Sequence, residues 1–250
     1  MMKKSIPNIL TCCNLISGCV ATYYAFHCGF KVAFICILLG AMFDFFDGMV
    51  ARLLNVSGKF GLQLDSLADD ITFGLAPSAM IFTMFMHVQY PAFMGNAFFF
   101  NVMPFTAFLM AAFSALRLAK FNLDERQHHG FIGMPTPANA IFWGGLISSC
   151  SSWLAGPEFN ALFLFLFMVL SCWLLVCEVP MFALKFKNLS WEDNRIKYIF
   201  AILVILIIAV SAFYGSQNDC IWQMISLGMA GCVGLYVMMS LVASYLPVEE

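Results

Sequence analysis

Residues 44–69 begin with D-F-F-D-G-M-V-A-R and, after a further eight residues, end with G-L-Q-L-D-S-L-A-D. They carry four carboxylates in an otherwise almost continuously apolar chain: Asp44, Asp47, Asp65 and Asp69. If both halves are helical, the first two acids are three residues apart on one helix and the last two are four apart on the next. Each pair then shares a helix face. Because buried carboxylates cannot all stay ionised without cations between them, the stretch predicts an intramembrane site for two metal ions.

The composition places this site in a membrane protein. Of the 250 residues, 62% are hydrophobic and 10% are charged, against about 25% charged in soluble domains. A membrane-spanning helix needs about 20 apolar residues, and eight stretches qualify: 8–28, 32–54, 62–86, 97–120, 136–154, 160–184, 196–214 and 221–245. We therefore expect an all-α, polytopic transmembrane helical bundle that forms a single domain over residues 1–250. The net charge of −2 argues against a nucleic-acid partner.

The basic residues predict the orientation of the eight spans. Eleven of the twelve lie on one side: Lys3, Lys4, Arg52, Lys59, Arg117, Lys120, Arg126, Lys185, Lys187, Arg195 and Lys197. Only Lys31 lies on the other side. Since Lys and Arg are enriched in cytoplasmic loops, both termini and the aspartate stretch are expected to face the cytoplasm. The opening M-M-K-K and the apolar run after it resemble a signal peptide, but we expect an uncleaved first span because seven more spans follow.

Polar residues in the first span are expected to border the aspartates. Asn8, Thr11 and, more loosely, Asn14 recur near helical spacing on one face. Hydrogen bonding between helices is the simpler explanation, but the neighbouring acids favour a shared polar cavity. In the second span, the small residues Gly48 and Ala51 leave room for a ligand against the helix between the carboxylates.

The roles of three further features can each be interpreted in two ways. Gly74 and Pro77 predict either an ordinary kink or a widened pocket near the site. Arg117 and Lys120 share a helix face at the cytosolic boundary. They could be anchors that extend their charged ends to the membrane surface, or they could form a cationic site for a phosphate or carboxylate; we favour the second. Glu178 is expected to make an interior hydrogen bond or to accompany a kink. Asp70 lies about 100° around the helix from its neighbour Asp69, so we expect it outside the metal shell.

Carboxylates suit hard divalent cations such as Mg²⁺ or Mn²⁺, which keep positions open for phosphate oxygens. Two such ions can stabilise the attacking and leaving oxygens of a displacement at phosphorus. The sequence has no P-loop, H-E-x-x-H or G-x-S-x-G motif. These observations predict metal-dependent phosphoryl transfer on a lipid substrate at the cytosolic leaflet.

The pattern D-x-x-D-G-x-x-A-R, eight residues, G-x-x-x-D-x-x-x-D resembles, at every fixed position, the signature of the CDP-alcohol phosphotransferase family. The flanking segments I-P-N-I-L-T-C-C-N-L and F-I-G-M-P-T-P resemble its bacterial integral-membrane members that use L-serine. This resemblance covers about residues 5–187. It implies a six-helix core, two additional helices at about 196–245, and a homodimer in the bacterial inner membrane. It also implies transfer of a phosphatidyl group from CDP-diacylglycerol to L-serine with release of CMP.

The resemblance further implies a role for each matching residue. Asp44, Asp47 and Asp65 would bind the metals, and Asp69 would be the general base that also touches the second metal. The nucleotide would be lined by Gly48, Ala51, Arg52 and Gly61, with Asn8 and Thr11 on the cytidine side. Arg117 and Lys120 would hold the serine carboxylate or the lipid phosphate.

Two alternatives stay open at this point. The acceptor alcohol could be inositol phosphate, glycerol phosphate or another amino alcohol, although a phosphorylated acceptor calls for more basic residues near the site. The four acids could instead line the path of a divalent-cation transporter. Against this, they all lie in one leaflet and no charged residue marks an exit on the other side.

Overall fold

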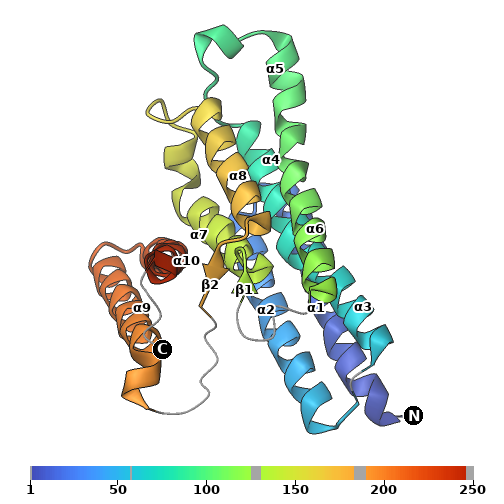
Figure 1. The fold of residues 1–250 in the computed structure, drawn as a ribbon. Coiled ribbons are helices and arrows are strands. Elements are labelled where there is room, and N and C mark those ends of the chain that lie inside the picture. Colours follow the sequence, from blue (N-terminus) through green and yellow to red (C-terminus); the bar gives the residue numbers. More distant parts are fainter. Residues whose placement is uncertain (1, 57, 125–130, 183–189, 246–250) are drawn as a thin grey trace.

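The computed structural model describes residues 2–56, 58–124, 131–182 and 190–245, which are almost entirely helical (Figure 1). The first half contains α1 (Met2–Phe26), α2 (Phe30–Leu53), α3 (Lys59–Asp69), the π-helix η1 (Asp70–Leu75), α4 (Ala76–Phe85), the 3-10 helix η2 (Ala92–Met94), α5 (Ala97–Val102), the 3-10 helix η3 (Met103–Phe108) and α6 (Leu109–Leu123). The second half contains β1 (Phe131–Ile132), α7 (Thr136–Leu154), α8 (Ala161–Val176), β2 (Pro180–Met181), α9 (Trp191–Gln217) and α10 (Ile221–Tyr245). The predicted all-α helical bundle is confirmed.

Each of the eight predicted spans coincides with a helix or a run of helices. Five segments of the described chain are long and apolar enough to cross a membrane: Ser5–Phe26, Phe30–Leu53, Ala97–Leu123, Asn194–Gln217 and Ile221–Ser244. The other three predicted spans correspond to α3–η1–α4, to α7 and to α8. The predicted end of the sixth span at residue 184 is wrong. Helix α8 ends at Val176, and the chain then forms β2, which pairs with β1 in antiparallel register, Phe131 opposite Met181.

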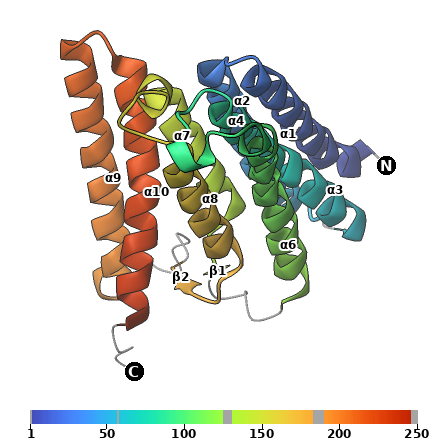
Figure 2. The same ribbon diagram turned by 90° about the horizontal axis from the view of Figure 1, so that it is seen from above.

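The helices form one bundle with a peripheral pair at one edge. Figure 2 shows α1, α2 and α3 on one side, α7 and α8 in the middle, and α9 and α10 on the other side. Helix α10 packs along α7, and α9 packs along α10. The main core gathers buried side chains from the first six predicted spans, α1 to α8, with Phe73, Met80 and Trp143 among the largest. A second, smaller cluster joins Met134, which follows β1, and Met181 of β2 to α9 and α10 through Phe200, Val233 and Tyr236.

Helices α1, α2 and η1 approach one another closely. A Cβ added to Gly40 of α2 would lie 2.5 Å from Thr72 Cγ2 and 2.9 Å from Asn14 Oδ1. Gly18 of α1 also faces Thr72, whose hydroxyl donates to the Asn14 carbonyl at 3.0 Å. Since small residues let helices in a membrane approach closely, these two glycines bring the polar face of α1 onto the other two elements.

The irregularity predicted near Gly74 and Pro77 is a π-helix rather than a simple proline kink. The wider turn runs from Asp70 to Leu75, and Pro77 follows it in the first turn of α4. Single turns of π-helix occur frequently at functional sites. Here the π-helix begins at the residue after Asp69, the last of the four motif acids.

At one end of the bundle α2 ends, α3 begins and α1 begins. We call this end of the bundle the motif end.

Candidate active site

Three of the four motif acids come together where α2 faces α3. Asp44, Asp47 and Asp65 each offer a carboxylate oxygen, and the three oxygens lie within 4.8 Å of one another. Asp47 is buried, and Oδ1 of Asp65 is a buried atom without a hydrogen-bond partner among the described residues. Three converging carboxylates with an unpaired buried oxygen fit a hard divalent cation such as Mg²⁺ or Mn²⁺.

Side chains of α1 hold two of the acids in place. The Thr11 hydroxyl donates to Asp47 Oδ2 at 2.6 Å, and the Asn14 amide donates from Nδ2 to Asp69 Oδ1 at 2.9 Å. Both residues are buried. The polar face of α1 therefore contacts the aspartates, as its spacing in the sequence suggested.

Asp69 occupies a separate position from the three converging acids. It ends α3 one helical turn beyond Asp65, is 8% exposed, and is not part of the group of three. Its roles as a metal ligand and as a base remain predictions. Asp70 also lies outside that group; it begins η1 and its carboxylate approaches Gly74 and Ser114.

A hollow of about 180 Å³ opens beside the three acids at the motif end. Its lining includes five of the six residues predicted to contact CDP: Asn8, Thr11, Gly48, Ala51 and Gly61. The sixth, Arg52, is exposed, and its guanidinium lies 3.9 Å from the position that a Cβ of Gly48 would take. The structure thus gathers the predicted nucleotide residues around one hollow next to the carboxylates.

The glycines around this hollow differ from those that pack helices together. A Cβ on Gly48 would meet only the Arg52 guanidinium, and one on Gly61 would meet only Asn8 Oδ1 at 3.7 Å. Neither contact is tight, in contrast with the close contacts at Gly40. Close helix packing therefore does not explain why glycine occupies positions 48 and 61. Glycine at these positions leaves space for a ligand in the hollow.

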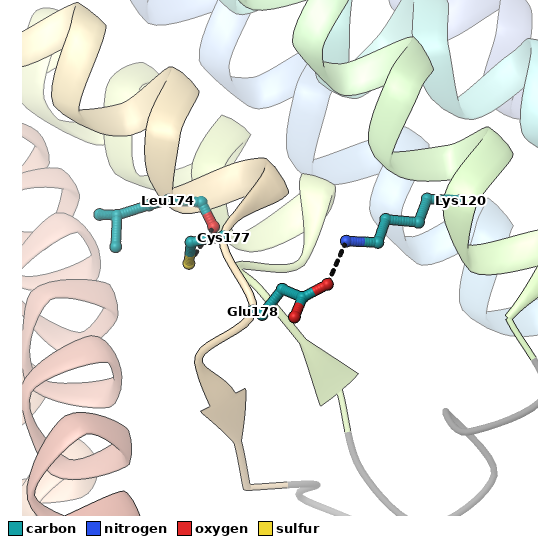
Figure 3. A network of polar contacts seen from close by, with 4 residues as sticks. All are labelled: Lys120, Leu174, Cys177 and Glu178. Atoms are coloured by element: carbon teal, nitrogen blue, oxygen red, sulfur yellow. Dashed lines mark hydrogen bonds and ion pairs between the residues drawn. The ribbon is translucent and has the colours of Figure 1, made fainter.

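The two basic residues of α6 lie in different surroundings. Arg117 is 6% exposed, and its guanidinium carbon lies 5.2 Å from the centroid of the Phe121 ring. Lys120 is at the rim and forms an ion pair with Glu178, with 3.4 Å between Nζ and Oε1 (Figure 3). Arg117 is therefore the basic residue inside the bundle, while Lys120 lies at the edge and pairs with an exposed carboxylate.

The expectation of an interior role for Glu178 is wrong. Its side chain is 72% exposed, because α8 ends two residues earlier and Glu178 lies on the segment that leads into β2. Figure 3 shows this segment, where the Cys177 thiol donates to the Leu174 carbonyl at 3.2 Å and Glu178 points toward Lys120.

A set of buried polar side chains beyond the motif was not predicted from the sequence. Ser114 of α6 and Asn139 of α7 are fully buried, and Thr136 is nearly so. Isolated polar residues in apolar spans were the available signal, but spacing alone does not show that they lie inside the bundle.

Comparison with known proteins identifies the class. Residues 4–239 match the model of the family named CDP-alcohol phosphatidyltransferase, so the chain belongs to this family. The five long apolar helices, together with this family, make it an integral membrane protein. The family match also covers α9 and most of α10, and so extends beyond residues 5–187, where the sequence motifs lie.

Several curated relatives carry a more particular name, CDP-diacylglycerol--serine O-phosphatidyltransferase. The relative from Helicobacter pylori is 35% identical over 137 residues, which is 54% of either chain. The one from Bacillus subtilis is 35% identical over 136 residues, 53% of this chain and 69% of that one. The one from Methanocaldococcus jannaschii is 30% identical over 213 residues, 78% of this chain and 94% of that one. The match thus spans about half the length of the Helicobacter relative and nearly all of the Methanocaldococcus relative.

Proposed function

We propose that this protein transfers the phosphatidyl group of CDP-diacylglycerol to the hydroxyl of L-serine and releases CMP. The observation that carries this proposal is the convergence of Asp44, Asp47 and Asp65 beside a hollow lined by small residues. The family and the names of the relatives supply the nucleotide-lipid donor and the serine acceptor.

The cluster of carboxylates is the place for two divalent ions. Asp44, Asp47 and Asp65 would hold them, with Asp69 contributing to the second. When bound, Mg²⁺ or Mn²⁺ would supply charge neutralisation for the pyrophosphate and for the departing CMP. The unpaired Oδ1 of Asp65 supports this assignment, since a buried carboxylate oxygen without a donor is costly unless a cation or a proton meets it.

Asp69 is the proposed general base. It would accept the proton of the serine hydroxyl as the serine oxygen forms a bond to the phosphorus next to diacylglycerol. The bond from that phosphorus to the oxygen of CMP then breaks, and the electron pair leaves with CMP. Asn14 supports this role because its amide holds Asp69 Oδ1 at 2.9 Å and so fixes the orientation of the carboxylate.

The hollow at the motif end is the proposed site for the CDP moiety. Gly48, Ala51 and Gly61 would let the nucleotide approach the helix backbones, with Asn8 and Thr11 on the cytidine side. Arg52, exposed at the edge of this site, would meet the phosphates. Arg117 and Lys120 are the candidates for the serine carboxylate or the lipid phosphate, and Arg117 is favoured because it lies inside the bundle.

We infer an orientation with both termini and the hollow on the cytoplasmic side of a bacterial inner membrane, in a homodimer. Support for the orientation comes from the distribution of basic residues, since the ends of α2 and α6 and the beginnings of α3 and α9 carry Lys or Arg. CDP and serine are both water-soluble groups, so a site that opens at the cytoplasmic surface would receive them directly.

A CMP-release assay on the purified protein tests the function. We expect release from CDP-diacylglycerol with L-serine, loss of release with EDTA, and recovery with Mg²⁺ or Mn²⁺. A panel of inositol phosphate, glycerol phosphate and ethanolamine tests the acceptor. Release with one of these but not with serine would replace the proposed acceptor. Flux of metal ions into proteoliposomes without any CMP release would favour a transporter instead.

A further inference from the structure

The last turn of α6 is joined to α3 by a hydrogen bond between two side chains. Asn122 of α6 donates from Nδ2 to the hydroxyl oxygen of Ser66 on α3 at 2.7 Å. The two residues lie 56 positions apart in the sequence, and both are partly buried. Ser66 directly follows Asp65, so this bond is made one residue away from an acid of the converging group.

The Ser66 hydroxyl also bonds to the backbone of its own helix. While its oxygen accepts from Asn122, its O–H donates to the Leu62 carbonyl at 3.1 Å, so the hydroxyl is both donor and acceptor. Leu62 lines the hollow beside the acids, as do Gly61 and Asp65. Two consecutive hydrogen bonds therefore connect α6 to the part of α3 that forms one wall of the hollow.

Burial alone does not fix the beginning of α3. The helix has 11 residues, and an isolated helix shorter than about 12–15 residues is only marginally stable in water. The buried residues of α3 are Ala68 and Asp69, which both lie in its last turn. The first two turns, which carry Gly61, Leu62 and Asp65, have no buried side chain. Their position therefore depends on contacts such as the one with Asn122.

Asp65 lies close to two other acids, which makes its position costly to maintain. Its carboxylate oxygen is within 4.8 Å of those of Asp44 and Asp47 on α2. Like charges at such distances repel, and the repulsion favours separation of α2 and α3 until a cation lies between them. Ser66 points about 100° around the helix from Asp65, so the bond to Asn122 holds α3 without occupying the carboxylate. Ligands that are already in place reduce the cost of binding.

We propose that Asn122 is a positioning residue for the metal site, because its bond to Ser66 holds Asp65 close to the two acids of α2. This inference rests on the proposed function, in which the three acids bind the divalent ions. Asn122 acts through Ser66 and the backbone of α3 and does not contact the ions. Its role thus differs from that of Thr11, whose hydroxyl bonds directly to an acid of the group.

Binding of Mn²⁺ to the purified full-length protein tests the proposal independently of turnover, with the electron paramagnetic resonance signal of the free ion as the readout. We expect Asn122→Leu and Ser66→Ala each to weaken Mn²⁺ binding about tenfold, as is typical when a group that supports a metal ligand is lost. The double variant should bind Mn²⁺ no more weakly than either single variant, because both substitutions remove the same hydrogen bond. Ser66→Thr keeps the hydroxyl and should bind Mn²⁺ like the wild type.

Asn218→Leu is the matched control, since Asn218 is an exposed asparagine whose amide donates to the Tyr214 carbonyl of α9 at 2.9 Å. Its affinity for Mn²⁺ should equal that of the wild type. If Asn122→Leu does not elute as a folded protein, Ser66→Ala, which removes a single oxygen, decides the question.

Wild-type Mn²⁺ affinity in the folded variants, or losses that add in the double variant, would overturn the proposal and leave the proposed function intact. Absence of Mn²⁺ binding by the wild type would overturn the proposal together with the metal assignment on which it rests. Normal Mn²⁺ binding by a wild type that releases no CMP with any acceptor would refute the proposed function alone.

Discussion

The site region, formed by α1, α2, α3 and η1, and the outer pair, formed by α9 and α10, both carry polar residues within apolar helices. In the site region some of these residues bond between helices and reach carboxylates, as Thr11 does with Asp47 and Asn14 with Asp69. In the outer pair, serine hydroxyls bond within their own helix: Ser216 to the Phe213 carbonyl, and Ser226 to the Trp222 carbonyl. A hydroxyl that donates to a carbonyl of its own helix needs no partner on another helix. A carboxylate can only accept hydrogen bonds, so it cannot pair with a helix carbonyl.

The hydrogen-bond partner therefore distinguishes polar residues that only pack within a membrane helix from those that form a site between helices. The outer pair does make hydrogen bonds to other segments, from Trp222 Nε1 to the Ser148 hydroxyl of α7 at 2.8 Å and from the Tyr236 hydroxyl to the carbonyl of Phe182, just after β2, at 3.0 Å. These are neutral hydrogen bonds that attach α10 to the bundle. Charges that converge in the interior occur, among the described residues, in the site region and at Arg117.

The largest expected effect comes from removing one of the three converging acids. Asp44→Asn should lower CMP release by about 10,000-fold, because the variant loses a negative ligand of the proposed metal site. The matched variant in the outer pair is Asp219→Asn, whose exposed aspartate lies between α9 and α10. It should retain wild-type activity. Equal activities of the two variants would contradict the contrast between the regions.

Removal of the proposed base comes next. Asp69→Asn should lower turnover by about 1,000-fold, within the range for a general base, while binding of CDP-diacylglycerol is retained. The amide is close in size to the carboxylate, so the hollow that receives the nucleotide is preserved. Turnover and equilibrium binding of the donor lipid are the two measurements. Near-normal turnover would refute the assignment of Asp69 as the base.

The hydrogen bond from α1 to Asp69 should have an intermediate effect. Asn14→Leu removes the donor at 2.9 Å and should reduce kcat by about 10- to 100-fold, as is typical when the hydrogen-bond partner of a functional carboxylate is lost. Ser226→Ala, which removes a buried hydroxyl from the outer pair, should leave kcat unchanged. A similar loss in both variants would show that buried polar groups contribute in the same way wherever they lie.

Much of the site region could be predicted from the sequence because its geometry is local. Two acids three residues apart on one helix share a face whatever surrounds them, and the short link to the next helix brings the second pair nearby. The same reasoning placed Asn8 and Thr11 beside the hollow. The eight spans followed from their apolar lengths, apart from the end of α8.

The errors concern features that depend on contacts between distant segments. Residues 177–184 are mostly apolar, but they include Pro180, which cannot continue a helix. The chain leaves α8 after Val176 and pairs as β2 with β1, some 50 residues earlier, which exposes Glu178. A two-residue strand has no periodicity to detect. The burial of Asn139 could not be predicted either, because the sequence of a span does not show whether a single polar residue faces lipid or the interior. The partner Lys120 of Glu178 likewise comes from another helix.

The smallest expected effect tests how the two regions are packed. A Cβ on Gly40 would collide with Thr72 and Asn14, whereas one on Gly231 of α10 would meet nothing within 4 Å. Gly40→Ala should therefore destabilise the protein by about 1–3 kcal/mol, the usual cost of overpacking, and should lower activity a few-fold because Asn14 is displaced from Asp69. Gly231→Ala should be neutral or slightly stabilising, since alanine is the better helix former. Thermal unfolding in detergent measures both variants. If Gly40→Ala unfolds at the wild-type temperature and remains fully active, then the close approach of α1, α2 and η1 is not what positions the acids.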